Sequence, residues 1–252
     1  MIKLSIAIIT FNEERNIARC LESVKEIADE IVIVDSISTD QTIELAKGYG
    51  ATIYRQKFLG HIEQKNLALQ KCSNDIVLSL DADEALDDEL RESIKFIKQN
   101  WKGDAYKINR LNNYAGQWIR HGSWYPDKKI RLLDKRKGRW KGINPHDRIE
   151  LNPAAHIHSL GGNILHFSFG SIHEHIEQIN KFTTIQAEAM FKEGRKTSWF
   201  DLNVKPGLYF FRDIFIRSGW RDGYYGWVIA KQSANSTYLK YAKLKALCAS
   251  AS

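Results

Sequence analysis

Short apolar runs alternate with amphipathic segments over the first hundred residues of the chain. Four runs, three of them rich in Ile and Val, predict buried strands over Leu4–Phe11, Glu30–Ser36, Ala51–Arg55 and Asp75–Asp83. The intervening segments carry apolar side chains at helical spacing and predict helices over Glu14–Glu26, Asp40–Tyr49 and His61–Cys72. This β-α-β-α-β-α-β order predicts an α/β fold, a mostly parallel sheet with helices on both faces.

The pattern becomes less regular after residue 100. Asp87–Asn100 predicts a surface helix with acidic residues first and lysines last, as the helix dipole favours. Further strands are expected at Ala105–Asn109, Lys129–Leu133 and Arg148–Leu151, a helix at Ile172–Glu193, and a break at Lys205–Gly207. We therefore expect a main domain over residues 1–198 and a helical C-terminal region over residues 199–252.

Composition and charge narrow the classes of protein. With 43% hydrophobic and 27% charged residues among 252, the chain reads as a globular protein with ample material for a core. No apolar run approaches the roughly 20 residues of a transmembrane helix, and the first run is too short for a signal peptide. The three cysteines are isolated, which disfavours a disulfide framework or a cysteine zinc site, so we expect a reducing cytoplasm.

The formal net charge of +7 is concentrated at one end of the chain. Residues 192–252 hold eleven Lys and Arg against four Asp and Glu, while the charges of residues 1–191 cancel. This asymmetry predicts a neutral catalytic body with a basic end that faces something acidic.

Candidate ligand residues follow the ends of three predicted strands. These are Thr10, Phe11, Asn12 and Glu13 after the first strand, Asp35 and Ser36 after the second, and Asp81, Asp83 and Glu84 after the fourth. The carboxyl ends of parallel strands meet at one edge, where such sheets bind ligands. Asp81 and Asp83 are two apart on an extended strand, so they face the same way and would suit Mg²⁺ or Mn²⁺ and the oxygens of a diphosphate. The same acids could merely cap the following helix, but their convergence with Asp35 favours a ligand site.

Several enzyme and metal classes are disfavoured by missing motifs. The chain has no GxGxxG after the first strand, no GxxxxGK[ST] and no GxSxG, which argues against dinucleotide-binding dehydrogenases, P-loop nucleotidases and α/β-hydrolases. The histidines lack HExxH spacing and a cysteine partner, so a zinc site is disfavoured.

Four motifs in order carry a resemblance to a known family. TFNEERNI, VDSISTDQT, QKNLAL and LSLDADE resemble the family 2 glycosyltransferases of GT-A fold. PDKKIRLLDKRKGRWKGINPHD, HFSFGSIHEHIEQINKF and GWRDGYYGWVIAKQSANSTYLKYAKL resemble the subgroup that adds sugars to the lipopolysaccharide inner core. The resemblance implies an inverting transfer of a hexose from a nucleotide-sugar, a UDP-sugar, with residues 1–100 binding the donor and residues 101–198 the acceptor.

The resemblance also implies roles for single residues. Asp35 would hydrogen-bond the nucleobase, Thr10, Phe11, Asn12 and Glu13 would line the nucleotide pocket, Lys65 would lie near the donor, and Asp81 would contact the ribose region. Asp83 would bind the divalent metal (Mg²⁺ or Mn²⁺), with His166 as a further metal ligand. Asp147 would be the general base, although the subgroup usually has Glu there, and Glu84 is the fallback base. The family's usual VDDGS reads VDSIS here, so Ser36 removes one carboxylate.

The basic tail is rich in aromatic residues. Its aromatic and basic side chains between Trp199 and Tyr241 suit the headgroup region of an anionic membrane, or alternatively complete the core of the main domain. Nucleic-acid binding is disfavoured because no recognition motif accompanies the basic residues. We therefore expect a cytoplasmic enzyme, peripheral on the inner face of the cell membrane, that acts on a glycolipid such as the lipopolysaccharide core.

Two other functions remain open. A sugar-phosphate nucleotidylyltransferase would share the sheet and the metal, but it needs a Gly-rich basic loop where this chain reads TFNEERN. A catalytically inactive glycan-binding or membrane scaffold protein on the same fold would bind a nucleotide without turnover.

Overall fold

The computed structural model describes residues 1–143 and 146–250, and these form two compact units. The first unit comprises Met1–Arg110 and Asp127–His166, and the second comprises Leu111–Pro126 and Phe167–Ser252. The units thus divide the chain at other places than residue 198, and the division at residue 198 stays a prediction about function.

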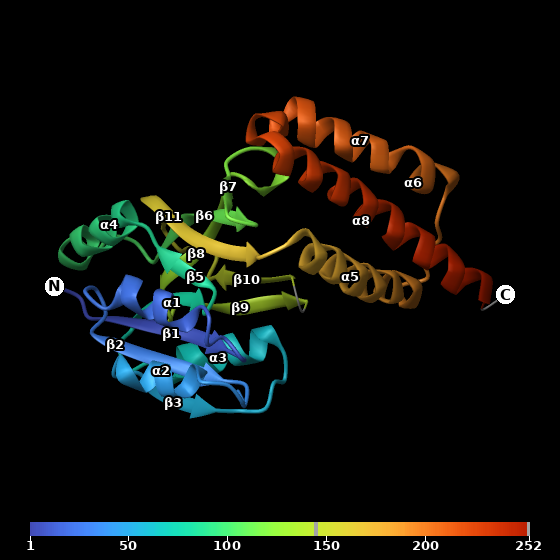
Figure 1. Cartoon of the computed structure of the whole chain (residues 1–252). Coiled ribbons are helices and arrows are strands. Elements are labelled where there is room, and N and C mark those ends of the chain that lie inside the picture. Colours follow the sequence, from blue (N-terminus) through green and yellow to red (C-terminus); the bar gives the residue numbers. More distant parts are fainter. Residues whose placement is uncertain (144–145, 251–252) are drawn as a thin grey trace. The chain divides into compact units, whose positions relative to one another are not determined.

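The first unit is built on a parallel sheet, as the sequence predicts. Its strands are β1 (Leu4–Thr10), β2 (Glu30–Asp35), β3 (Thr52–Arg55) and β4 (Ile76–Asp81), and they lie in the order β3-β2-β1-β4. Figure 1 labels the first three of these strands in that order. Each neighbouring pair is parallel, and Thr10 is in register with Asp35. The predicted α/β architecture is confirmed, and the ends of β1, β2 and β4 share one edge.

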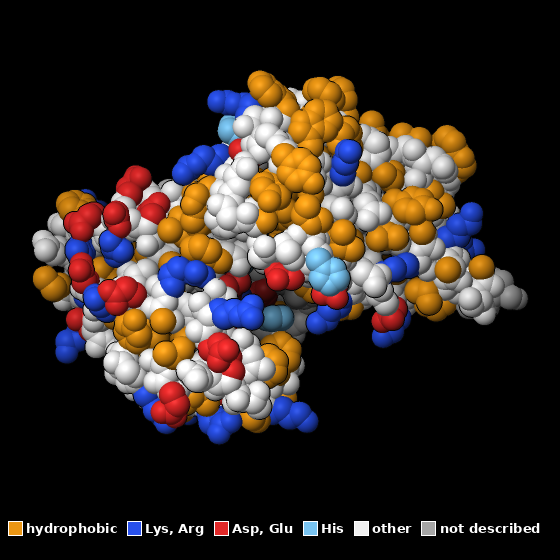
Figure 2. Space-filling model, viewed as in Figure 1, with side chains coloured by type: hydrophobic (Ala, Val, Ile, Leu, Met, Phe, Trp, Pro, Cys, Tyr) orange, Lys and Arg blue, Asp and Glu red, His pale blue; other side chains and the backbone are white. Residues whose placement is uncertain are grey.

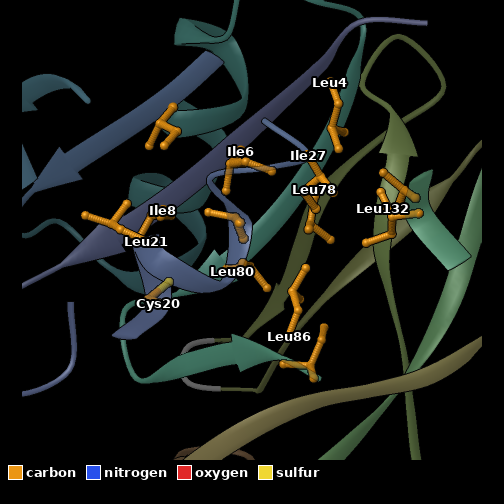
Figure 3. Packing of buried hydrophobic residues seen from close by; sticks show 14 of the residues in the cluster. Leu4, Ile6, Ile8, Cys20, Leu21, Ile27, Leu78, Leu80, Leu86 and Leu132 are labelled. Carbon is orange, nitrogen blue, oxygen red and sulfur yellow. The ribbon is translucent and has the colours of Figure 1, made fainter. Parts of the chain in front are cut away.

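Helices cover both faces of this sheet, and alternate side chains of β1 pack against them. The helices are α1 (Ile17–Val24), α2 (Thr42–Gly48), α3 (His61–Lys71) and α4 (Asp88–Gln99). Leu4, Ile6 and Ile8 pack with Leu21 of α1 on one face, shown in Figure 3. Ala7 packs in a second cluster that includes Leu69 of α3. This alternation follows from the two-residue period of a strand.

Antiparallel strands extend the sheet beyond β4. They are β5 (Glu84–Leu86), β6 (Ala105–Tyr114), β8 (Asp127–Asp134) and β11 (Ile157–Phe169), while β9 (Gly138–Ile143) and β10 (His146–Leu151) form a separate hairpin. The three strands expected here exist and are longer than expected. The sequence did not predict β11, whose Ile157–Phe169 segment contains two adjacent glycines and is mostly half-buried or exposed.

The second unit is mainly helical. Its helices are α5 (Ile172–Lys192), α6 (Trp199–Asn203), α7 (Lys205–Phe211) and α8 (Gly223–Ser250), with the short turns η1 (Gly122–Trp124), η2 (Arg212–Ile216) and η3 (Gly219–Asp222) and the strand β7 (Gln117–Ile119). Both α6 and α7 lie along α8 (Figure 1). A break was expected at Lys205–Gly207, and the structure has it one residue earlier. Val204 separates the two helices, and Pro206 lies in the first turn of α7, where proline is tolerated.

An aromatic cluster forms the core of the second unit. The fully buried Tyr114 contacts the rings of Trp124, Phe169, His175 and Tyr225. Its hydroxyl lies 3.0 Å from Nδ1 of His175. His175 is therefore a core residue of this unit. In the part of the chain that the structure describes, every helix is too short or too polar to cross a membrane.

Candidate functional site

The loops that follow β1 and β2 are tied together by Asp35. Its carboxylate is fully buried and accepts hydrogen bonds from the Ser38 hydroxyl at 2.5 Å and the Ser38 backbone N–H at 2.9 Å. The Ser38 Oγ in turn accepts from the backbone N–H of Asn12 at 2.9 Å. Asn12 has a positive φ of 53°, a conformation that Asn tolerates better than most residues. Asp35 therefore shapes this edge, and its predicted bond to a nucleobase stays a prediction.

The other residues after β1 surround the same edge. Thr10 is buried and its hydroxyl has no hydrogen-bond partner among the residues that the structure describes, which is the state expected of a polar group that contacts a ligand. Phe11 is 57% exposed. The backbone N–H of Glu13 donates to Thr42 Oγ1 at 2.7 Å. Burial raises the pKa of the Glu13 carboxyl, and nearby acids add to this rise. The structure thus places all four predicted pocket residues at the end of β1.

A lysine from α3 joins two of the predicted carboxylates. The Nζ of Lys65 lies 3.0 Å from Oδ1 of Asp81 and 2.8 Å from Oδ2 of Asp147. The Lys65 side chain is only 6% exposed, so this is a buried array and not a solvated helix lysine. The alternative predicted for Asp147 was an ion pair with Arg148 or Arg139. Among the described residues Asp147 pairs with Lys65 instead, and Arg148 pairs with Glu150 at 2.7 Å.

Arg131 of β8 completes the charged cluster and was not singled out from the sequence. Its guanidinium lies 2.8 Å from Oε1 of Glu84 and 3.3 Å from Oδ2 of Asp81. The other Glu84 oxygen accepts from the backbone N–H of Asp81 at 2.9 Å. Glu84 is fully buried, so both of its oxygens are engaged away from solvent. Such an enclosed carboxylate is poorly placed to take a proton from an acceptor.

The pKa values of Asp81 and Glu84, the two acids that contact Arg131, shift in opposite directions. Burial raises the pKa of Asp81, but the charges of Lys65 and Arg131 outweigh it, and the pKa lies well below its ordinary value. For Glu84, burial raises the pKa more than Arg131 lowers it. Asp81 is therefore the ionised partner of the two cations at neutral pH.

Trp140 of β9 forms one wall of the cluster. The Nζ of Lys65 lies 4.4 Å from the centre of its ring and the Cζ of Arg131 lies 5.4 Å from it. The ring is 4% exposed, so it shields both cations from water and attracts them through its π face. Like Arg131, Trp140 belongs to segment 126–147, which resembles the lipopolysaccharide subgroup, but its contacts with the two cations could not be predicted from the sequence.

Asp83 and His166 are brought together although 83 positions separate them. The Nε2 of His166 lies 3.1 Å from Oδ2 of Asp83, and β11 pairs with β5 so that His166 is in register with Glu84. Both side chains are partly exposed, that of His166 at 18% and that of Asp83 at 27%. Among residues 1–143 and 146–250, no group of three or more His, Cys, Asp or Glu is arranged to hold a metal ion. The pair nevertheless fits a divalent cation that takes its remaining ligands from phosphate oxygens, because it offers one carboxylate and one imidazole nitrogen.

Comparison with known proteins gives three kinds of likeness. The model of a family described as glycosyl transferase family 2 matches residues 5–159. An uncharacterized glycosyltransferase of Rickettsia typhi is 36% identical, over 98% of this chain and 88% of that protein. The lipopolysaccharide core biosynthesis glycosyltransferase LpsC of Rhizobium meliloti is 30% identical, over 96% of this chain and 91% of that protein. The solved structure of S. aureus TarS 1–349 is 19% identical, over 99% of this chain and 92% of that one, with a TM-score of 0.46.

Proposed function

The chain belongs to glycosyl transferase family 2, and on this premise we propose that it transfers a hexose from a UDP-sugar to a glycolipid such as the lipopolysaccharide core, with inversion at the sugar carbon. One observation carries the proposal: Lys65 bridges Asp81 and Asp147 in a buried array at the edge where the strands end. The transfer needs an acidic side chain to take the proton of the acceptor hydroxyl. It also needs a cation to stabilise the negative charge that develops on the leaving diphosphate.

The donor would bind at the edge formed by β1, β2 and β4. The residues proposed to hold the nucleotide are Thr10, Phe11, Asn12, Glu13, Asp35 and Asp81. Asp83 and His166 would hold Mg²⁺ or Mn²⁺. When bound, such a cation would neutralise charge on the diphosphate. Lys65 would add a fixed positive charge beside the leaving group, so the chain itself supplies part of that stabilisation.

Asp147 is the proposed general base. Its side chain is 11% exposed, so it retains some access, whereas Glu84 is fully enclosed by Arg131 and the backbone of Asp81. The Lys65 ammonium holds the Asp147 carboxylate in place at 2.8 Å. Asp147 would take the proton of the acceptor hydroxyl as that oxygen attacks the sugar carbon and the nucleoside diphosphate leaves. Positioned bases typically contribute about 10²–10⁴-fold in rate.

The second unit carries the proposed membrane surface. Figure 2 shows hydrophobic side chains gathered where α6, α7 and α8 lie in Figure 1. The exposed apolar residues include Trp199, Leu208, Phe211, Phe215, Ile216 and Trp220. Only some aromatic residues of the tail close a core, as Tyr225 does against Tyr114. Exposed rings beside basic residues suit a peripheral position on an anionic membrane, where a glycolipid acceptor would lie.

Calorimetric titration tests the donor site. UDP, GDP, ADP and CMP are titrated with and without Mn²⁺ into the wild type, Asp83→Ala and His166→Gln. We expect metal-dependent binding of UDP that Asp83→Ala abolishes and His166→Gln weakens. Asp88→Ala is the matched control, because Asp88 is exposed at the start of α4 and should bind as the wild type does.

Two outcomes would count against the proposal. If none of the four nucleotides binds with or without metal, the transferase assignment loses its support. If UDP binds but no sugar is transferred to any lipopolysaccharide-core acceptor, the inactive scaffold on the same fold is favoured.

A further inference from the structure

A cavity of about 610 Å³ in the second unit has an unusual lining of charge. Arg120 directly follows β7, Arg217 directly follows η2, and Arg221 lies in η3. The hydroxyl-bearing residues Ser123, Tyr125 and Ser218 also line it. Three guanidinium groups with nearby hydroxyls form a set of hydrogen-bond donors that matches the oxygens of a phosphate.

The three arginines are not neutralised by the chain itself. In the part of the chain that the structure describes, no ion pair joins Arg120, Arg217 or Arg221 to a carboxylate, and all three are exposed. By contrast, Arg212, just upstream, pairs with Asp213 at 2.9 Å. Unpaired arginines that converge on one cavity leave a local positive charge for an anionic ligand.

The acid Asp222, next in the chain to Arg221, holds the backbone in place with both of its carboxylate oxygens. Asp222 is buried, and its Oδ2 accepts from the backbone N–H groups of Arg120 at 3.0 Å and His121 at 2.7 Å. Its Oδ1 lies 2.8 Å from Nδ1 of His121. Both oxygens are thus occupied in fastening the two cavity walls to each other, which organises the site before a ligand arrives.

A strained residue places two of the arginines on the same cavity. Ser218 has a left-handed backbone with a φ of 56°, which costs a non-glycine residue energy and persists where the surrounding structure demands it. Its carbonyl accepts from the backbone N–H of Arg221 at 3.0 Å. The carbonyl of Arg217 accepts from the N–H of Gly122 at 2.9 Å. The turn therefore brings Arg217 and Arg221 to the cavity that Arg120 also lines.

The same segment is strongly apolar on its exposed side. Ile216 lines the cavity and is 70% exposed, and its neighbours Phe215 and Trp220 are more than half exposed. A soluble phosphate would need only the arginines and hydroxyls. A phosphate carried on a lipid would also use the exposed apolar side chains, which would enter the acyl boundary while the charged group occupies the cavity.

We propose that this cavity binds the phosphate group of an anionic membrane lipid. The inference rests on the proposed membrane partner of this chain but not on the donor site, which lies in the first unit and is measured by nucleotide binding. Arginine suits this role because its planar fork donates two parallel hydrogen bonds to phosphate oxygens.

Vesicle binding tests the proposal with the full chain and without nucleotide or metal. Phosphatidylcholine vesicles are compared with vesicles that contain phosphatidic acid and with vesicles matched in charge by cholesteryl hemisuccinate, whose anion is a carboxylate. The variant Arg217→Gln/Arg221→Gln is compared with Lys192→Gln/Lys196→Gln, which removes the same charge from exposed positions of the second unit. Arg217→Lys/Arg221→Lys keeps the charge but loses the paired hydrogen bonds.

We expect the wild type to prefer phosphatidic acid over the carboxylate lipid. The arginine-to-glutamine variant should bind phosphatidic acid vesicles about 30-fold more weakly, from about 1 kcal/mol per basic residue at such a surface. The lysine variant should lie between it and the wild type, and the Lys192/Lys196 control should stay within about threefold of the wild type. UDP binding should be the same in all of these variants.

Three results would overturn the proposal while leaving the donor site untouched. One is equal affinity for phosphatidic acid and the carboxylate lipid, which indicates charge alone. The second is an equal loss in the arginine and Lys192/Lys196 variants. The third is binding of glycerol phosphate in solution with the same dependence on the arginines and no gain from vesicles, which indicates a soluble phosphate ligand.

Discussion

The Nζ of Lys65 lies 2.8 Å from Oδ2 of Asp147, and only 6% and 11% of the two side chains are exposed. The pair links α3 to β10, two elements that are far apart in the sequence and share the first unit. Because the same ammonium also contacts Asp81, one lysine connects the strand end that is proposed to bind the donor with the acid proposed to take the proton. The arrangement makes Lys65 a position where donor binding and catalysis can be separated by experiment.

Lys65→Met should lower the rate of sugar transfer more than it weakens UDP binding. The substitution removes the positive charge proposed to lie beside the leaving diphosphate and takes from Asp147 the cation that holds it, whereas Asp81 keeps Arg131, so we expect kcat to fall about 10²–10³-fold. Lys71→Met, on the same helix but with its Nζ over the Tyr54 ring, should transfer sugar as the wild type does. Nucleotide release with a lipopolysaccharide-core acceptor measures kcat. A wild-type kcat in Lys65→Met would contradict the proposed role.

Substitution of the two candidate bases should have different effects. Asp147→Asn should reduce kcat about 10²–10⁴-fold while UDP binding changes little, because the amide keeps the size of the side chain but cannot accept the proton. Glu84→Gln should retain most of the activity, because Glu84 is enclosed by Arg131 and the Asp81 backbone. Steady-state kinetics of both variants decide between them. The reverse pattern would make Glu84 the base.

Arg131→Met should destabilise the first unit. The guanidinium is 4% exposed and is shared by Asp81 and the fully buried Glu84, so its removal leaves Glu84 without its nearest cation, whereas Asp81 keeps Lys65. Breaking a buried ion pair on one side typically costs about 3–5 kcal/mol in the free energy of unfolding. Urea unfolding followed by tryptophan fluorescence measures the change.

Arg136→Met is the control for that substitution. Arg136 is 62% exposed and pairs with Asp75, which is half exposed, and with Asp134, which is 7% exposed. Because solvent reaches this guanidinium, we expect its removal to cost less than that of Arg131, about 1 kcal/mol. The double variant Arg131→Met/Glu84→Leu should recover part of the loss, because it removes the buried acid as well. Equal losses in Arg131→Met and Arg136→Met would show that the buried cluster contributes no more than a surface pair.

The sequence predicted the parallel half of the sheet and the edge that carries the site, because strand and helix periods are local properties. Asp35, Asp81 and Asp83 follow strands that periodicity identifies directly, and the parallel order brings the strand ends together. Arg131 could not be found this way. It lies 47 and 50 positions from its partners Glu84 and Asp81, and nothing in the alternation of β8 distinguishes a buried arginine from an exposed one.

The second unit was harder to predict for a related reason. Aromatic residues at helical spacing fit a buried face or a membrane face equally well, and only the packing separates Tyr225, which contacts Tyr114, from Phe215, which is 53% exposed. Likewise, the cavity lined by Arg120, Arg217 and Arg221 lies between a segment near residue 120 and one near residue 218. The two segments are held together in part by Asp222, which binds the backbone of the first one.

Acid should destabilise the second unit through His175. Burial lowers the pKa of this imidazole to about 4 from an ordinary value of 6.5, and the side chain is enclosed by aromatic rings. Between pH 6.5 and pH 4 the unfolded chain binds a proton that the folded chain does not, so falling pH favours unfolding. The contribution of His175 is therefore complete above about pH 6.5 and is lost progressively down to about pH 4, by up to about 3 kcal/mol.

The pH dependence of unfolding in His175→Gln tests this assignment. Glutamine cannot be protonated, so the variant should lose the part of the slope between pH 4 and pH 6.5 that His175 contributes, although it should be less stable at neutral pH because the aromatic packing is weakened. His173→Gln, at a side chain that is 80% exposed, should keep the wild-type slope. If His175→Gln loses stability with falling pH as steeply as the wild type does, the acid sensitivity comes from other groups, and His175 is not the residue that must remain neutral for this core to form.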